Sequence, residues 1–353
     1  MKTETVAAIH DRRWQSPPSA TLRRGRQAAA AERAVDLLRK GEIVALPTET
    51  VYGLAADAFD PIAVTKIFEA KERPRFDPLI LHIPDEKWLE RVAKIDSRSR
   101  ASIEKLIAQF WPGPLTLVLD RRPMVPEIVT AGLDTVAVRM SSNPVFAEII
   151  SAFGKPLAAP SANRFGRISP TTAQHVFDEV GGRIPLIVDA GQTAHGIEST
   201  IIAVHDNKID ILRRGPITAE QLAEFGEVNI VRASQKISAP GQLPSHYSPK
   251  TPLRLIADAE SFPPVKDRRV GLLAWNASIP EERFAAVRTL SQRQDLREAA
   301  ANLFRCLREL DELDLNLIVA ERVPAQGLGA AILDRLERAS HDSDIQDTPE
   351  RIL

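Results

Sequence analysis

Two basic residues close together at the end of an apolar helical pattern indicate a site for a negatively charged ligand. Lys71 and Arg73 lie in AKERPRFDPL, residues 70–79, where Pro74 and Pro78 stiffen the chain. One cation at the end of a helix is explained by its favourable interaction with the helix dipole. On this stretch alone the capping role is the commoner explanation, and a clamp for a phosphate group is the alternative that the second cation raises.

Small polar residues follow two further predicted strands. In AAPSANRFGRISPT, residues 158–171, the hydroxyl of Ser161 and the amide of Asn163 come just after a strand; PTETVYGL, residues 47–54, brings hydroxyls and a carboxylate to the end of another. Ligands bind to open α/β sheets at the carboxyl ends of strands. An ordinary Ser/Asn turn explains either stretch alone, but together with residues 70–79 they indicate a shared ligand site.

An α/β sheet must position these residues. Apolar runs rich in β-branched residues predict its strands, namely EIVAL, LILHI, LTLVL, TVAVRM, LIVDA, STIIAV and IDILRR. Side chains that can cap helices precede the helical patterns between them, at Asp60-Pro61, at Asn143-Pro144, at Thr171 or Thr172, and at Thr218-x-x-Gln221. Irregular turns between residues 118 and 138 favour a mixed sheet over a pure βαβ repeat.

Composition predicts two α/β domains joined by a connector. A chain of 353 residues corresponds to about two domains. We expect a flexible N-terminal extension (1–27), a larger sheet domain (28–232), a Pro- and Ser-rich connector (233–252), a smaller Rossmann-like α/β domain (253–340) and a frayed tail (341–353). The connector contains four prolines, which exclude a continuous helix or a central strand.

The overall composition is that of an ordinary globular protein. The formal charge of −1 provides no global field for nucleic acid, so any anion site must be local. The lone cysteine, Cys306, excludes an intrachain disulfide and fits a cytoplasmic location. No run reaches the roughly 18 apolar residues that a membrane span needs. The Arg-rich leader lacks the apolar core of a secretory signal, and Glu4 and Asp11 argue against an organelle transit peptide.

Several common catalytic motifs are missing, among them the Walker phosphate loop, G-x-S-x-G and H-E-x-x-H. The stretches that are present resemble the YrdC-like threonylcarbamoyl-AMP synthases in their long form with an added C-terminal domain. They are PTETVYGL, KERPRFDPL, WPGPLTLVL, AGLDTVAVRM, APSAN, GIEST, ILRRGP and HYSP, and they keep the family's order from about residue 28 to 340. The family signature K-x-R…S-x-N is matched by Lys71, Arg73, Ser161 and Asn163.

The resemblance implies a YrdC-like twisted mixed sheet and a nucleotidyltransferase. The amine of L-threonine captures bicarbonate or CO2, the resulting carbamate attacks the α-phosphate of ATP, and pyrophosphate leaves. Mg2+ is expected to be carried by ATP. A separate threonylcarbamoyl transferase complex then passes the group to the adenosine beside the anticodon of a tRNA, and the resemblance leaves a direct contact of this protein with tRNA open.

The resemblance also implies a role for each matching residue. The catalytic residues are Lys71, Arg73, Ser161 and Asn163. The ATP site adds Thr135, Ser169, Arg213 and Pro244. The threonine site consists of Thr50, His82, Arg139, Ser199 and the backbone of Ala159. The alternative for Arg139 is a strand arginine on the solvent face, but its strand is otherwise apolar, which favours the ligand role. For His82 the pattern alone favours a satisfied sheet histidine, and only the family match assigns it to the threonine site.

Asp77 stands where family members often have Asn, and a carboxylate beside a triphosphate is repelled unless it binds Mg2+ or turns away. A direct contact between Asp77 and ATP is therefore not expected.

The connector stretch PGQLPSHYSP, from residue 240, is expected to fold over the site as a lid, with residues 244–247 near the nucleotide.

Two other functions stay open on the sequence. One is a module that binds double-stranded RNA or tRNA without catalysis, although the charge of −1 and the few aromatic residues speak against it. The other is carbamoyl transfer of the hydrogenase-maturation type, whose zinc-finger and acylphosphatase-like patterns are missing from this sequence. Pyrophosphate release that requires both L-threonine and bicarbonate distinguishes the synthase from the RNA-binding module.

Overall fold

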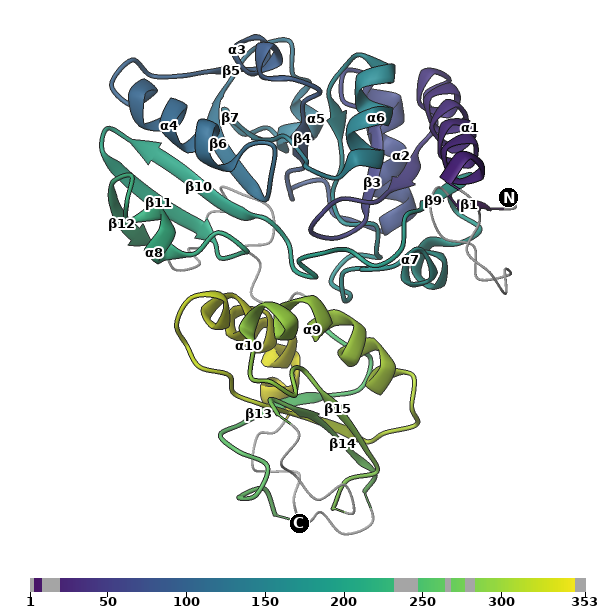
Figure 1. Cartoon of the computed structure of the whole chain (residues 1–353), viewed down its shortest axis with the longest axis vertical. Coiled ribbons are helices and arrows are strands. Elements are labelled where there is room, and N and C mark those ends of the chain that lie inside the picture. The colour runs from purple at the N-terminus through teal and green to yellow at the C-terminus, as the bar shows by residue number, and fades with distance from the viewer. Residues whose placement is uncertain (1–2, 8–19, 232–246, 264–267, 277–282, 347–353) are drawn as a thin grey trace. The chain divides into compact units, whose positions relative to one another are not determined.

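The computed structural model describes residues 3–7, 20–231, 247–263, 268–276 and 283–346 (Figure 1). The chain divides into two compact units. The larger comprises Met1–Phe165, Pro170–Ala194 and Glu198–Gln242, and the smaller comprises Gly166–Ser169, His195–Ile197 and Leu243–Leu353. Two short segments that precede the connector in the sequence thus belong to the smaller unit.

A mixed β-sheet forms the centre of the larger unit. Its strands are β1 (Glu4–Ala7), β2 (Val44–Leu46), β3 (Gly53–Asp57), β4 (Ile80–His82), β5 (Ala93–Lys94), β6 (Leu115–Arg121), β7 (Thr135–Arg139), β8 (Leu157–Ala158), β9 (Leu186–Asp189), β10 (Thr200–His205), β11 (Lys208–Arg213) and β12 (Glu227–Ile230). They are paired in the order β1-β9-β2-β3-β8-β4-β7-β6-β10-β11-β12, with β5 alongside β6. The sheet contains parallel pairs such as β4–β7 and antiparallel pairs such as β6–β7, so the predicted mixed sheet is confirmed.

Helices cover both faces of this sheet. They are α1 (Ala20–Arg39), α2 (Pro61–Lys71), η1 (Glu86–Trp88), α3 (Leu89–Val92), α4 (Arg100–Phe110), α5 (Glu127–Thr130), α6 (Pro144–Phe153), α7 (Ala173–Val180) and α8 (Ala219–Leu222). Alternate strand residues point to opposite faces. Val44 and Leu46 therefore enter the core that contains α1 and α6, while Ala45 enters the core that contains α2.

The smaller unit is built on a parallel sheet. Its strands are β13 (Leu253–Ile256), β14 (Val270–Ala274), β15 (Ala286–Thr289) and β16 (Leu317–Glu321), paired in the order β13-β16-β14-β15. Two helices pack on them, α9 (Leu296–Asp311) on β14 and β15, and α10 (Leu328–Gln346) on β13. This arrangement agrees with the predicted Rossmann-like α/β fold.

The helix starts that the sequence predicted are confirmed. Asp60 accepts hydrogen bonds from the backbone of residues 62 and 63, with Pro61 in the first turn of α2. Asn143 does the same for α6, Thr172 is the cap of α7, and Thr218 and Gln221 form the capping box of α8. Each of these signals acts within four residues of chain, which is why the sequence alone was sufficient.

The two ends of the chain differ from the prediction. Residues 1–27 are not a uniformly flexible extension, because Glu4–Ala7 form β1, parallel to β9, and α1 already begins at Ala20. Likewise α10 continues to Gln346, past the predicted start of the tail. Most of the connector, residues 232–246, lies outside the described residues, and with it most of the predicted lid.

Where the description of the connector resumes, its first side chain is buried in the smaller unit. Tyr247 stacks on Phe304 with ring centroids 5.6 Å apart, and the guanidinium of Arg335 lies 5.2 Å from its ring. Among the described residues, no helix is long and apolar enough to cross a membrane.

Candidate functional site

A single row of paired residues carries polar side chains across five neighbouring strands. In the registers of β4, β7, β6, β10 and β11, His82 is opposite Arg139, Arg139 opposite Thr116, Thr116 opposite Ile201, and Ile201 opposite Arg213. Side chains of directly paired residues share one face of a sheet. Residues that the sequence assigned to two substrates therefore lie on one face, with the apolar Ile201 among them.

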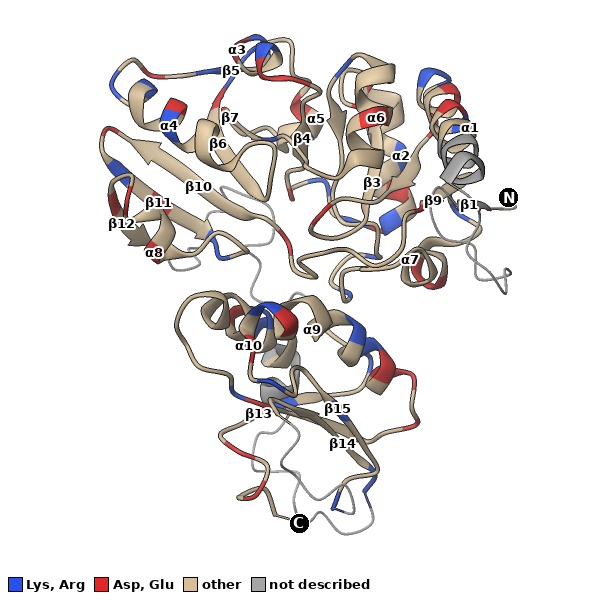
Figure 2. Ribbon diagram, in the orientation of Figure 1, with Lys and Arg blue, Asp and Glu red and all other residues tan. Residues whose placement is uncertain are grey.

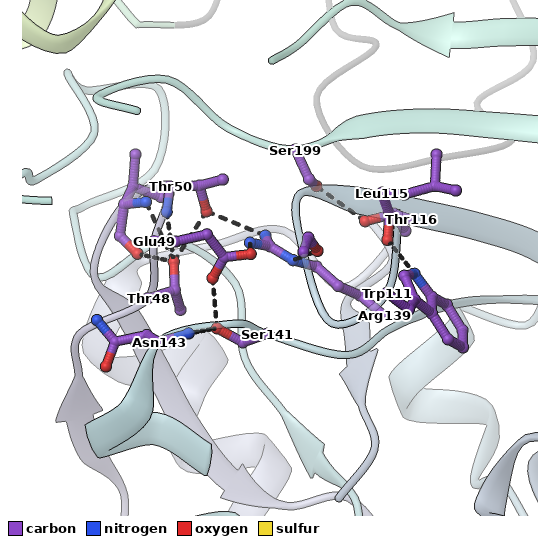
Figure 3. Close-up of polar contacts among 12 residues, drawn as sticks. Thr48, Glu49, Thr50, Trp111, Leu115, Thr116, Arg139, Ser141, Asn143 and Ser199 are labelled. Carbon is purple, nitrogen blue, oxygen red and sulfur yellow. Dashed lines mark hydrogen bonds and ion pairs between the residues drawn. The ribbon is translucent and has the colours of Figure 1, made fainter. Parts of the chain in front are cut away.

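Arg139 lies second in this row, between His82 and Thr116. It is only 3% exposed, so it is not a solvent-facing strand arginine. Its Nε donates to the carbonyl of Gly113 (3.3 Å), one terminal nitrogen donates to Thr50 Oγ1 (3.0 Å), and the other donates to Glu49 Oε1 (2.5 Å) (Figure 3). Among the described residues these contacts use three of its five N–H groups. One N–H on each terminal nitrogen remains, which suits a carboxylate bound by both.

Glu49 is the residue of this site that sequence reasoning missed. It lies after β2, and its second carboxylate oxygen accepts a hydrogen bond from Ser141 (Figure 3). Burial alone would raise the pKa of Glu49, but the charge of Arg139 and the hydrogen bonds from Ser141 and Arg139 outweigh it and hold the pKa below its ordinary value. The signal was present in PTETVYGL as an acidic residue at a strand end, but its partner is 90 positions away.

Hydroxyl groups of the turn that contains Glu49 extend the site. Thr48 Oγ1 lies 2.8 Å from Thr50 Oγ1 and donates to the carbonyl of Val51 (2.6 Å), while the backbone N–H groups of Thr50 and Val51 donate to it. This turn fixes the Thr50 hydroxyl against Arg139. A small ligand held by the arginine would meet a pre-oriented hydroxyl, the kind of group that recognises another hydroxyl.

His82 is held neutral beside Arg139. Burial, followed by the charge of Arg139, lowers the pKa of His82 to about 3, and a backbone hydrogen bond with Ala159 acts in the opposite direction. The ring lies 4.8 Å from that of Phe146, centroid to centroid. The imidazole is therefore uncharged at neutral pH, and it places a buried, neutral polar group beside Arg139.

Ser199 links the arginine row to a second cation. The Ser199 hydroxyl lies 2.8 Å from Thr116 Oγ1. Arg213 donates to the Ser199 hydroxyl (3.0 Å) and to the Ser199 carbonyl (3.1 Å). The two chain segments approach so closely that a Cβ on Gly215 would lie 2.4 Å from the backbone nitrogen of Thr200. Glycine at position 215 thus allows Arg213 to reach Ser199.

Lys71 is a buried cation at the end of α2. It is 1% exposed, and its ammonium donates to the carbonyls of Ser161 (2.6 Å) and Asn163 (2.5 Å). Burial, followed by the charge of Arg73, holds the pKa of Lys71 well below its usual range. The structure thus brings together the two stretches that carry the K-x-R and S-x-N residues.

Arg73 is paired with the acidic residue that departs from the family pattern. Its terminal nitrogen lies 2.8 Å from Asp77 Oδ2, and it also donates to the carbonyls of Asp77 (Nε, 3.2 Å) and Pro78 (2.8 Å). Both side chains are almost fully buried, and Lys71 and Arg213 lie within electrostatic range of Asp77. Lys71, Arg73 and Arg213, called the cation cluster below, thus all act on the charge of one carboxylate.

The three remaining predicted ATP residues are Thr135, Ser169 and Pro244. Thr135 begins β7 on the same face as Arg139 but four residues earlier, about 13 Å along the strand. Ser169 is buried and belongs to the smaller compact unit. Pro244 lies outside the described residues.

The described side chains contain no group of three or more His, Cys, Asp or Glu residues that would hold a metal ion. Mg2+ readily keeps several waters and binds through phosphate oxygens with one or two carboxylates.

The fold and the site define a two-unit α/β protein in which buried Arg139 pairs with Glu49 and buried Arg73 pairs with Asp77. The family described as "Telomere recombination" (Sua5/YciO/YrdC) matches residues 36–215, and the family described as "Threonylcarbamoyl-AMP synthase, C-terminal domain" matches residues 217–341. The chain belongs to the threonylcarbamoyl-AMP synthase family.

Similar proteins cover nearly the whole chain. The threonylcarbamoyl-AMP synthase of Pyrococcus abyssi is 38% identical over 324 residues, which cover 87% of this chain and 93% of the relative. That of Bacillus subtilis is 40% identical over 323 residues, covering 87% and 92%. A crystal structure of P. abyssi Sua5 complexed with L-threonine superposes with a TM-score of 0.83 at 34% identity, covering 96% of this chain and 98% of the other.

Proposed function

We propose that this chain is an L-threonylcarbamoyladenylate synthase that joins L-threonine, bicarbonate or CO2, and ATP. In the first step an N–C bond forms between the threonine amine and CO2, and the amine loses a proton. In the second step a carbamate oxygen bonds to the α-phosphorus of ATP while the bond to the departing pyrophosphate breaks. The family membership and the threonine complex of the P. abyssi relative support this assignment.

The observation that carries the proposal is the pair of N–H groups left on Arg139 beside the fixed Thr50 hydroxyl. They would bind the threonine carboxylate in a bidentate manner. Thr50, with His82, Ser199 and the backbone of Ala159, would enclose the rest of the amino acid. A hydrogen bond to the threonine hydroxyl rejects valine far more strongly than apolar contacts reject serine.

The cation cluster would hold the phosphates. Negative charge develops on the departing pyrophosphate, and buried cations stabilise it more strongly than solvated ones do. We assign this role to Lys71, Arg73 and Arg213, with Ser161 and Asn163 next to them. Thr135, Ser169 and Pro244 stay as proposed ATP contacts, and we propose that ATP binds together with Mg2+.

The division of labour follows the predicted domains. Residues 28–232 would catalyse the reaction, residues 233–252 would connect the units, and residues 253–340 would hold the connector. The product would then serve a separate transferase complex that modifies tRNA. Figure 2 shows basic and acidic residues interspersed along helices such as α4 and α9, unlike the single-sign surface typical of an RNA-binding module.

Pyrophosphate release is the direct test. Wild-type protein should release pyrophosphate only when ATP, L-threonine and bicarbonate are all present. Lys71→Ala should lower the rate by at least about 100-fold, because it removes a buried cation from the charge that develops. The matched control is Lys66→Ala on the same helix, whose lysine forms a half-exposed ion pair with Glu42, and which should keep near wild-type activity.

Denaturation curves of both variants must accompany the assay, because the Lys71 ammonium also satisfies two carbonyls. A folded Lys71→Ala protein with full activity would contradict the role of the cluster. RNA binding by a wild-type protein that releases no pyrophosphate would support the binding module instead.

A further inference from the structure

Asp77 is a fully buried carboxylate in the middle of the cation cluster. It is 0% exposed, and its Oδ2 lies 2.8 Å from a terminal nitrogen of Arg73. Lys71, from the end of α2, and Arg213, from the end of β11, also act on its charge. The acidic group thus lies where the proposed function requires the phosphates of a nucleotide to be neutralised.

The contacts of Asp77 are incomplete. Among the described residues, neither carboxylate oxygen accepts a hydrogen bond of good geometry, and the contact with Arg73 is an ion pair only. Burial raises the pKa of Asp77 above its usual value, although the charges of Arg73, Lys71 and Arg213 act in the opposite direction. A buried charge without hydrogen bonds is unfavourable and needs an explanation.

The lysine of the cluster is perturbed in the complementary sense. Burial and then Arg73 lower the pKa of Lys71, while the charges of Asp77 and Glu179 act to raise it. The cations therefore repel one another, and Asp77 offsets part of that repulsion. A polyphosphate would offset it more fully, because it supplies several negative oxygens with free lone pairs.

We propose that Asp77 is the built-in counter-ion of the nucleotide site, which neutralises Arg73 in the empty enzyme and yields that contact to the polyphosphate when ATP binds. This inference rests on the proposed function. Asp77 then competes with ATP before the reaction and with pyrophosphate after it. Its presence weakens the binding of both and speeds the departure of the product.

The alternative role for Asp77 is that of a Mg2+ ligand, which would strengthen nucleotide binding. The two roles predict opposite effects of removing the charge. The test variant is Asp77→Asn, which keeps the volume, and Asp77→Ser is a second variant should the first fold poorly. The matched control is Glu72→Gln, which removes a carboxylate from the same loop, where it forms a half-exposed pair with Arg183.

The measurement is isothermal titration calorimetry of the full-length protein with ATP and with pyrophosphate, each with and without Mg2+. Asp77→Asn should bind both ligands about tenfold more tightly under both conditions, and Glu72→Gln should stay within about twofold of the wild type. Weaker binding in the presence of Mg2+ alone would identify a metal ligand. Weaker binding under both conditions, or no change, would likewise overturn the inference.

A second readout is the proton balance. If a bound phosphate replaces the contact with Arg73, the Asp77 carboxylate takes up a proton, helped by its raised pKa. Wild-type protein should therefore bind ATP with proton uptake, seen by comparing buffers of different ionisation enthalpy, and its affinity should fall as the pH rises. Asp77→Asn should lack that uptake, and equal uptake in both proteins would contradict the proposal.

These experiments separate the inference from the proposed function. Tighter polyphosphate binding by Asp77→Asn, in a protein whose wild type shows no threonine-dependent turnover, would keep the counter-ion and reject the synthase. Normal turnover with unchanged affinity would do the reverse.

Discussion

Each of two predicted substrate arginines is paired with a buried carboxylate, and the two pairs are completed to different degrees. Glu49 accepts hydrogen bonds from Arg139 and Ser141, and its pKa is lowered. Asp77 contacts Arg73 without a good hydrogen bond, and its pKa is raised. Under the proposed function, Glu49 orients Arg139 for a bound ligand, whereas Asp77 occupies the place of a ligand beside Arg73.

The largest expected difference is in stability. Glu49→Gln leaves Arg139 buried without its counter-charge and should lower the free energy of unfolding by about 3 kcal/mol. Asp77→Asn should cost clearly less, because its environment already disfavours the ionised carboxylate. Urea denaturation of the two variants measures both values, and equal losses would remove the distinction between the pairs.

A smaller effect is expected on threonine binding. Glu49→Gln should raise the KM for threonine about tenfold, because Arg139 loses a charged hydrogen bond that orients it. The affinity for ATP should stay near that of the wild type. Ser141→Ala removes only one neutral donor to Glu49 and should act in the same direction, by about threefold. A fall in kcat at unchanged KM would show that Glu49 does not position the carboxylate site.

The smallest effect sharpens the comparison through pH. The lowered pKa of Glu49 means that its stabilisation is complete above the ordinary glutamate range, about 4.3, and is lost as the pH falls through the folded-state value. The raised pKa of Asp77 has the opposite sign, so the wild type gains stability relative to Asp77→Asn as the pH falls through that value. The difference in the free energy of unfolding between the wild type and each variant should be measured from neutral to acid pH. This difference should change with opposite signs for Glu49→Gln and Asp77→Asn, and changes of the same sign would contradict the assignment.

Local signals were readable in the sequence, and non-local ones were not. The caps at Asp60, Asn143 and Thr218 depend on neighbours within four residues and were predicted correctly. Strand β1 was missed because its stability comes from β9, about 180 positions away. Sequence periodicity contains no information about which distant strand is the partner.

The same limit explains the incomplete prediction of the site. Resemblance to the family supplied Arg139 and His82, but only the register of β4 and β7 shows that they are direct neighbours. Nothing in the local pattern around Glu49 distinguishes it from a solvated turn residue, because its burial depends on β7 and on Ser141. Asp77 was recognised as unfavourable beside phosphate, but its partner Arg73 became evident only in the structure.

The composition break after residue 232 does not separate the two compact units completely. Two segments that precede it, Gly166–Ser169 and His195–Ile197, belong to the smaller unit. Arg308 of α9 donates to the carbonyl of Ile168, Arg167 pairs with Asp311, and Gly196 packs so tightly on Ala300 and Ala301 that a Cβ would overlap them. A protein shortened at the proline-rich stretch would retain these internal loops while losing everything they rest on. The composition break after residue 232 is therefore a poor position at which to truncate the chain.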